Sequence, residues 1–168
     1  MNKQDLTFIY ANDYRDVRDD CHAIKENASV IARKYAPQIA ASPPDRCLLV
    51  PIPGHEGKAS HTLLLGAAIC AEAFKNGKRS VMVLDCLVCR PHLSLCKLKH
   101  EGEDVSGVEL GMRFYSKGLR TMFRRFVRNK YTIVLLDNVV DTGKTVSDAM
   151  AVVGECPVVC IGLVDKDK

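Results

Sequence analysis

The residues best suited to chemistry lie in one segment, where an apolar run meets a carboxylate and then a polar loop. Ile133–Leu136 predicts a buried strand that ends at Asp137, and a helix is expected over Thr145–Val153. Backbone N–H groups at the start of a helix bind anions, because they are unpaired and the helix dipole reinforces them. Gly143 allows backbone angles that aim several N–H groups at one point. The segment therefore predicts a phosphate-binding loop, formed by Asp141, Thr142, Gly143, Lys144 and Thr145.

Two carboxylates beside this loop narrow the choice of anion. A carboxylate next to a phosphate is repulsive unless a proton, a pair of hydroxyls or a metal ion lies between them. Sugar hydroxyls that donate to Asp137 would meet this need, and Asp141 lies within the loop itself. The combination indicates a phosphorylated sugar, bound together with Mg2+. The plain structural alternatives are that Asp137 forms a turn and that Asp141 caps the next helix.

A nucleotide-triphosphate P-loop is the rival interpretation of the same segment. Gly143-Lys144-Thr145 fits the second half of the G-x-x-x-x-G-K-[ST] pattern. The first glycine of that pattern would fall at position 138, which is Asn138. Because the glycine that lets the backbone wrap phosphates is missing, we expect a different kind of phosphate site.

The order of strand, acid and loop resembles the phosphoribosyl diphosphate (PRPP) signature of the type I phosphoribosyltransferases. That signature has four apolar residues, two acids, two apolar residues and a polar loop with Thr-Gly-x-Thr. The resemblance implies that Asp137 holds the ribose hydroxyls and the metal, and that residues 141–145 bind the 5-phosphate. In 6-oxopurine members the acid at the position of Asp141 takes part in proton transfer, which makes it the candidate catalytic residue. Asn138 replaces the second acid, and an amide can bond a hydroxyl but carries no charge toward a metal.

Two further segments fit the same family. The loop after the first core strand would hold pyrophosphate, through Pro53, Gly54, Gly57 and Lys58, and its Val-Pro-Ile-Pro start is similar to ComF-like competence proteins. Residues 89–112 would form the mobile loop that closes over the site, with Lys97, Lys99 and His100 neutralising the departing pyrophosphate.

The resemblance implies a Mg2+-dependent transfer of the phosphoribosyl group from PRPP to a nitrogen acceptor, with release of pyrophosphate. The partner would be PRPP or a nucleoside 5′-monophosphate. Two alternatives stay open: a non-catalytic regulatory protein that binds the same ligands, and a ComF-like protein that handles nucleic acid.

Two other clusters carry alternatives of their own. The first cluster consists of Cys86, Cys89, His92, Cys96 and His100. These residues could bind zinc, or they could be core cysteines followed by ordinary loop residues. The second is a basic run that suits nucleic-acid phosphates, a solvated helix face or the subunit contact of a homodimer, with Arg113, Lys117, Arg120, Arg124, Arg125, Arg128 and Lys130.

The elements that must position these residues follow from apolar periodicity. Further strands are predicted over Leu6–Tyr10, Cys47–Val50, Val81–Val88 and Val158–Val164. Further helices are predicted from a cap at Asn12 or Asp13 to stop signals at Pro37 and the Ser42-Pro43-Pro44 run, over Ala59–Lys75 with Leu63, Ala67, Ala71 and Phe74 inward, and over Lys117–Arg128. Strands that alternate with helices predict an α/β fold in three layers, with a mostly parallel sheet between helices and only a minimal hood.

Composition sets the outer limits. A chain of 168 residues with 47% hydrophobic residues suits one domain, residues 1–168. No apolar run approaches a membrane span, and the start of the chain does not resemble a secretory signal. The eight cysteines are therefore expected to be reduced, in the cytoplasm. A net charge of +4 agrees with an anionic ligand.

Overall fold

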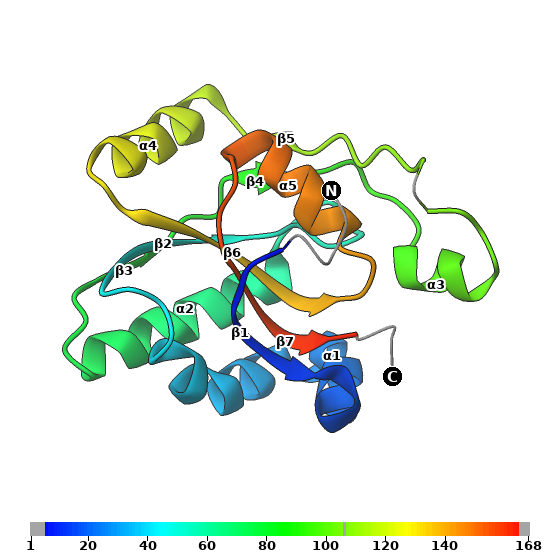
Figure 1. Ribbon diagram of the computed structural model, residues 1–168, viewed down its shortest axis with the longest axis horizontal. Coiled ribbons are helices and arrows are strands. Elements are labelled where there is room, and N and C mark those ends of the chain that lie inside the picture. Colours follow the sequence, from blue (N-terminus) through cyan, green and yellow to red (C-terminus); the bar gives the residue numbers. More distant parts are fainter. Residues whose placement is uncertain (1–5, 106, 165–168) are drawn as a thin grey trace.

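The computed structural model describes residues 6–105 and 107–164, and a five-stranded parallel sheet lies at its centre (Figure 1). The strands are β1 (Phe8–Asp13), β2 (Arg46–Pro51), β3 (Ser80–Val83), β6 (Thr132–Val140) and β7 (Val158–Leu163), in the spatial order β1-β7-β6-β2-β3. The expected fold class, a mostly parallel sheet flanked by helices, is confirmed.

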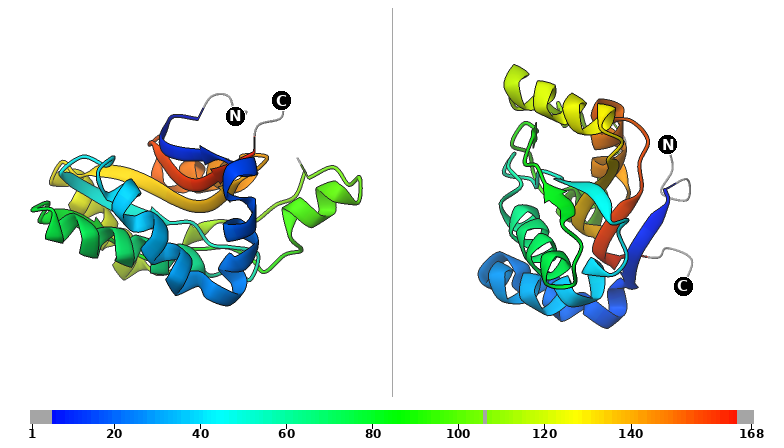
Figure 2. Two further views of the ribbon diagram at one scale, coloured as in Figure 1. Left: turned by 90° about the horizontal axis from the view of Figure 1, so that it is seen from below. Right: turned by 90° about the vertical axis from the view of Figure 1, so that its left-hand side faces the viewer.

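Helices cover both faces of this sheet, and a small antiparallel pair of strands lies beside it (Figure 2). The helices are α1 (Tyr14–Ala40), α2 (Ser60–Lys75), α3 (Leu95–His100), α4 (Lys117–Arg128) and α5 (Lys144–Val153), and the small pair is β4 (Leu87–Val88) with β5 (Arg113–Phe114). None of the helices formed by the described residues has the length and apolar character that crossing a bilayer requires.

Alternation along the strands divides the core into two clusters. Cys47 and Leu49 of β2 face the cluster beneath α1 and α2, whereas Leu48 and Val50 face the cluster beneath α4 and α5. All four side chains are fully buried. A strand covered on both faces has no polar side to show, which explains its continuous apolar sequence.

The chain reverses its direction of winding between the two central strands. From β2 it continues to β3 on one side, and from β6 it continues to β7 on the other. In parallel sheets the crevice at such a switch point, beyond the carboxyl ends of the strands, is where ligands bind. The loops that follow β2 and β6 both open into this crevice.

The inward face of α2 differs from the prediction. Ala67, Ala71 and Phe74 are exposed, and the buried face is formed by Thr62, Leu65, Gly66, Ile69 and Ala73. The helix is apolar on most of its circumference, so periodicity alone did not select one face. Gly66 decides the orientation, because a Cβ there would lie 2.9 Å from Val83 Cγ2 and 3.2 Å from Leu136 Cδ2.

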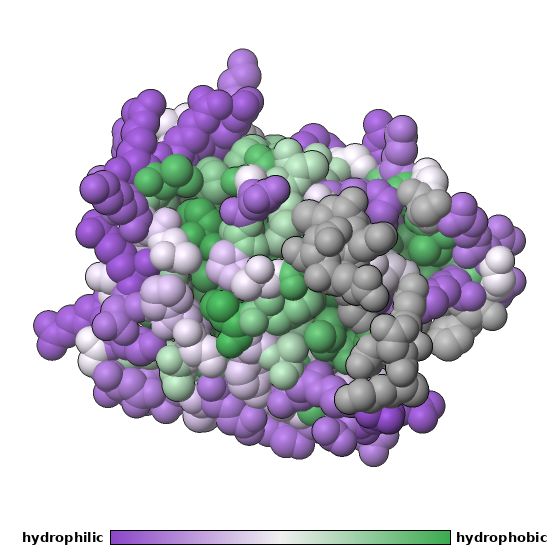
Figure 3. Space-filling view, viewed as in Figure 1, coloured by the Kyte–Doolittle hydropathy of each residue, from purple (hydrophilic) through white to green (hydrophobic). Residues whose placement is uncertain are grey.

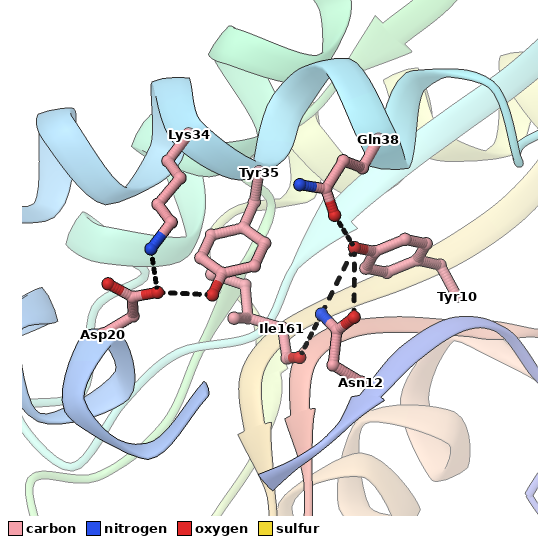
Figure 4. Close-up of polar contacts among 7 residues, drawn as sticks. All are labelled: Tyr10, Asn12, Asp20, Lys34, Tyr35, Gln38 and Ile161. Carbon is pink, nitrogen blue, oxygen red and sulfur yellow. Dashed lines mark hydrogen bonds and ion pairs between the residues drawn. The ribbon is translucent and has the colours of Figure 1, made fainter. Parts of the chain in front are cut away.

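Helix α1 continues through Pro37 and ends at Ala40, just before the Ser42-Pro43-Pro44 run, and it bends sharply at Asn27. The bend lets the two halves of the helix meet side by side (Figure 4). Tyr35, in the second half, donates a hydrogen bond of 2.5 Å to Asp20 in the first half, and Lys34 pairs with the same carboxylate at 2.6 Å. The bonds from these two side chains hold the pKa of Asp20 below its usual range.

The expected strand Val81–Val88 is two separate strands. Pairing with β2 covers β3 and ends with the hydrogen bond from Leu84 N–H to the Leu49 carbonyl. The chain then turns away, and β4 pairs with β5 over the other face of the sheet. Asp85 lies at the turn, and a charged residue is disfavoured in the middle of a buried strand.

The close approach of α2 to the sheet gives the first prediction. Gly66→Ala is expected to lower the free energy of unfolding by roughly 1–3 kcal/mol, because the added methyl group overlaps packed side chains. Gly118→Ala in α4 is the matched control, since its Cβ meets no atom closer than 3.8 Å. That variant should gain about 0.5–1 kcal/mol from helix propensity. Urea denaturation measures both, and equal effects would contradict the packing of α2.

Candidate functional site

Strand β6 runs further than the sequence predicts, and this places Asp137 inside the strand rather than at its end. Pairing with β2 stops at Leu136, whereas pairing with β7 continues to Val140. The expected loop of residues 138–144 therefore shortens to three residues between β6 and α5. The apolar residues Val139 and Val140 extend the strand because β7 is still beside them. Beyond Leu136, β6 has a free edge that faces the crevice.

The loop from Asp141 to Gly143 leads into α5 with unpaired backbone donors. Gly143 is the N-cap residue and has φ +78°, a left-handed conformation that other residues rarely adopt. Thr142 Oγ1 accepts a hydrogen bond of 3.2 Å from the Lys144 N–H. Within the described part of the chain, the N–H groups of Gly143, Thr145 and Val146 have no hydrogen-bond partner. This arrangement is suited to bind an anion at the start of the helix.

A cavity of about 350 Å³ lies over this loop. Asp137, Asp141, Thr142, Gly143 and Thr145 line it, together with Pro53 and Gly54 from the loop after β2. Lys99 and Leu95 of α3 line another side. The fold thus brings together residues that the sequence separates by about ninety positions, and the volume suits a small metabolite.

A smaller cavity of about 70 Å³ adjoins the first. Asp137, Gly54 and His55 line both cavities, whereas Asn138 and Lys58 line the smaller one alone. Lys58 is exposed and forms no ion pair with any described acid. The two cavities and the carboxylate between them form a row from the β6–α5 loop to the β2–α2 loop.

The carboxylate of Asp137 is partly buried and has no described cation beside it. Burial raises its pKa to about 6, although the backbone N–H groups of Asn138 and Val139 donate to it and act in the opposite direction. The bond from the Asn138 N–H measures 2.7 Å. A carboxylate kept in such a place without a cation is a candidate to meet a ligand's hydroxyl groups or metal.

Residues 89–112 reach the site through α3. The Lys99 ammonium lies 2.6 Å from the Asp141 carboxylate, at the edge of the larger cavity. Lys97 points elsewhere, because it is exposed and pairs with Glu101 at 3.8 Å. The side chain of His100 lies outside the described residues. Of the three basic residues expected in this segment, Lys99 is placed at the cavity.

Two other predicted site residues have structural roles. Lys144 turns along its own helix and contacts both Asp148 oxygens, at 2.6 and 2.8 Å. Gly57 is buried with φ +85°, and a Cβ there would lie 2.7 Å from the Cys89 carbonyl oxygen. Its glycine is required by the packing of the loop against residues 89–91, whereas Gly54 is open toward the cavities.

The structure adds cavity residues that the sequence patterns did not indicate. Tyr14 begins α1, and its ring lines the larger cavity because β1 lies beside β7. His55 lines both cavities. His92, which the sequence marked only as a candidate zinc ligand, also lines the larger cavity, and its Nε2 atom is buried without a hydrogen-bond partner among the described residues. No local spacing connects these three residues to a phosphate site, since pairing between distant segments places them.

The candidate zinc residues do not form a ligand set in the part of the chain that is described. Cys86 and Cys89 are buried, and no group of three or more ligating side chains occurs among the described residues. The side chains of Cys96 and His100 lie outside the described residues.

Asp137→Asn tests the uncompensated carboxylate through stability. The folded-state pKa is raised from 3.8 to about 6, so ionised Asp137 costs stability above that range. At pH 7.5 the free energy of unfolding of the variant is expected to exceed that of the wild type by up to about 3 kcal/mol. The gain should shrink as the pH falls from about 6 toward 4, because the native carboxyl becomes protonated.

Urea denaturation across this pH range measures the effect, with Asp148→Asn as the control. Asp148 is paired with Lys144, so its replacement should cost about 0.5 kcal/mol or less at pH 7.5. A wild type and an Asp137→Asn variant of equal stability at pH 7.5 would contradict the assigned environment.

Comparison with known proteins identified no relative of this chain. A scan against protein-family models, a search of curated proteins and a search of solved structures each found no match.

Proposed function

We propose that this protein binds PRPP in the crevice between β2 and β6 and transfers its phosphoribosyl group to a nitrogen acceptor, releasing pyrophosphate. The observation that carries the proposal is the position of Asp137. Its carboxylate lines both cavities, with the N–H groups of the β6–α5 loop at one end of the row and Lys58 at the other. A ribose with a phosphate at C5 and a diphosphate at C1 has the same order of charges and hydroxyls.

Each end of the row suits one part of such a ligand. The unpaired N–H groups of Gly143, Thr145 and Val146 would receive the 5-phosphate. The ribose hydroxyls would donate to Asp137, with the Asn138 amide beside it. Gly54 and Lys58 would receive the diphosphate in the smaller cavity.

Transfer breaks the bond between C1 of the ribose and the diphosphate oxygen and forms a bond from C1 to the acceptor nitrogen. The transition state has oxocarbenium character, so stabilising the departing charge is the main task of the protein. Lys99 is placed for this role once it leaves Asp141 for the diphosphate. Asp141, released from that pair, would accept the proton that the nitrogen loses.

The residues of the site suit Mg2+ as the counter-ion of the diphosphate. Mg2+ is usually held by one or two carboxylates together with phosphate oxygens of the substrate. Asp137 supplies one carboxylate without a described cation beside it, and Asn138 supplies an uncharged amide. Mg2+ would neutralise the diphosphate as it departs, and Asp137 would hold the sugar in line.

We place the protein in the cytoplasm. Cys21, Cys47, Cys70, Cys86, Cys89 and Cys156 are free thiols in the described part of the chain, as in proteins of reducing compartments.

Asn138 favours a second candidate function, a regulatory protein that binds PRPP or a nucleoside 5′-monophosphate without turnover. An amide in place of the second acid keeps a hydrogen bond to the sugar but reduces the negative charge available to the metal. Binding and turnover must therefore be tested separately.

Calorimetric titration with PRPP and Mg2+ tests the binding site. Thr142→Ala removes the hydroxyl that orders the loop, and Asp141→Asn removes the pair to Lys99. Thr142→Ala is expected to weaken PRPP binding by about tenfold, equivalent to about 1.4 kcal/mol. Asp141→Asn releases Lys99 and removes a negative charge beside the phosphate, so it should change the affinity in the opposite direction. Thr121→Ala, on the exposed side of α4, is the matched control and should bind like the wild type. Unchanged affinity in both site variants would remove the β6–α5 loop from consideration.

Pyrophosphate release on mixing the protein with PRPP, Mg2+ and a panel of nucleobases tests turnover. Release that requires one base is expected, and Lys99→Met should lower kcat by about 100-fold, since it removes charge that meets the leaving group. Asn138→Asp should raise Mg2+ affinity, because it restores a second carboxylate. PRPP binding without release from any base would select the regulatory candidate.

A further inference from the structure

The positive charge of this chain is concentrated in one segment outside the site. From Leu110 to Leu136 the sequence has seven cations and no acid, whereas the whole chain has a net charge of +4. The rest of the chain is therefore net negative. The α4 basic surface, as we name it, consists of Arg113, Lys117, Arg120, Arg124, Arg125, Arg128 and Lys130. Such segregation is typical of surfaces that bind polyanions.

These cations are exposed and have no acidic partners. All seven residues are exposed, and none forms an ion pair with an acid in the described part of the chain. The ion pairs found among the described residues all lie outside this segment. Hydrophilic side chains gather visibly over α4 in the space-filling view (Figure 3).

The apolar face of α4 is packed against the protein's own core, and this decides between a membrane and a polyanion as the partner of the basic surface. Phe123 is buried and its ring lies 5.3 Å from Phe114, while Phe126 packs edge-on against Tyr131 at 4.9 Å. The apolar face of the helix is thus used by the protein's own core. A helix that binds a membrane surface must insert that face into lipid, so the exposed charges suit a polyanion in solution better.

An exposed aromatic side chain stands beside the cations. Tyr115 is 70% exposed, although its backbone is fixed by a hydrogen bond of 2.9 Å from its N–H to the Cys86 carbonyl. Phe114 packs against the core, whereas Tyr115, the residue that follows β5, is exposed and lies between Arg113 and Lys117 in the sequence. An aromatic ring held in solvent among cations is the arrangement on which unpaired bases stack.

The geometry of the helix supplies a row for successive phosphates. Arg120, Arg124 and Arg128 are spaced by four residues and share one stripe of α4, about 12 Å long. The helix lies at the opposite end of the sheet from α3 and the cavities (Figure 1), since β6 begins after α4 and ends at the site. A polymer on this surface would leave the crevice open.

We propose that the α4 basic surface, with Tyr115, binds single-stranded nucleic acid. Arginine and lysine side chains would contact the phosphates, and a base would stack on the Tyr115 ring. Sequence-tolerant binding is expected, because every base offers a flat face and the phosphates carry no sequence information. The surface and the crevice are separate, so this site does not depend on the activity proposed above.

Fluorescence anisotropy with labelled oligonucleotides of about 20 nucleotides, DNA and RNA, at roughly 50 mM salt tests the proposal. Arg120→Glu with Arg124→Glu is expected to weaken binding at least tenfold and to reduce the slope of log K against log salt by about 1.4. The matched control is Lys25→Glu with Arg33→Glu on α1, two exposed residues with the same change in net charge. The control should lose less than about twofold.

Tyr115→Ala tests the stacking contact and should weaken binding about tenfold, whereas Tyr115→Phe should bind like the wild type. Equal losses in the two double charge variants would overturn the assigned surface. A duplex bound as tightly as the single strand, or a Tyr115→Ala variant that binds normally, would overturn the single-strand assignment. Binding to phosphatidylserine vesicles without binding to any oligonucleotide would replace nucleic acid by a membrane. The α4 variant should keep the PRPP affinity of the wild type, which separates this test from that of the crevice.

Discussion

The site depends on one mismatch in strand pairing. Strand β6 is paired with both β2 and β7 at Leu135 and Leu136, and with β7 alone beyond Leu136. The last bond from the β2 side runs from Ile52 N–H to the Leu136 carbonyl, and the next N–H, that of Gly54, bonds to Lys58 instead. Because the chain turns away after β2, β6 has no pairing partner on the β2 side from Asp137 onward. The crevice, and the position of the partly buried carboxylate that lines it, both follow from the end of this pairing.

Stability and function oppose each other at this place. A carboxylate whose pKa is raised by burial destabilises the folded chain near neutral pH, and a valine or asparagine there would remove the cost. On the same cavity, Nε2 of His92 is buried without a hydrogen-bond partner among the described residues. Ligand contacts satisfy groups of this kind, and a core without function has no reason to keep them.

Positive charge is arranged differently at the two ends of the sheet. At the crevice, backbone N–H groups and single lysines face a space suited to a small ligand, and Lys99 is already paired with Asp141. At α4, several unpaired side chains form an open convex row. A small phosphate is best held by a closed cradle, whereas a polymer needs an exposed stripe that leaves its ends free. The two surfaces therefore need not compete.

The sequence by itself determined the parallel α/β fold, the strand that leads to Asp137 and the glycine-containing turn before the next helix, because apolar runs, acids and glycine act through local backbone preferences. Tertiary structure decided what depends on neighbours. Pairing with β7 extended β6 to Val140, and the close packing of Gly66 set which face of α2 lies on the sheet. The strand expected over Val81–Val88 became two separate strands, β3 and β4. The tertiary structure also brought Tyr14, His55 and His92 to the cavity. Contacts between segments far apart in the chain leave no periodic signal, so packing alone sets which face is buried and which side chains share a site.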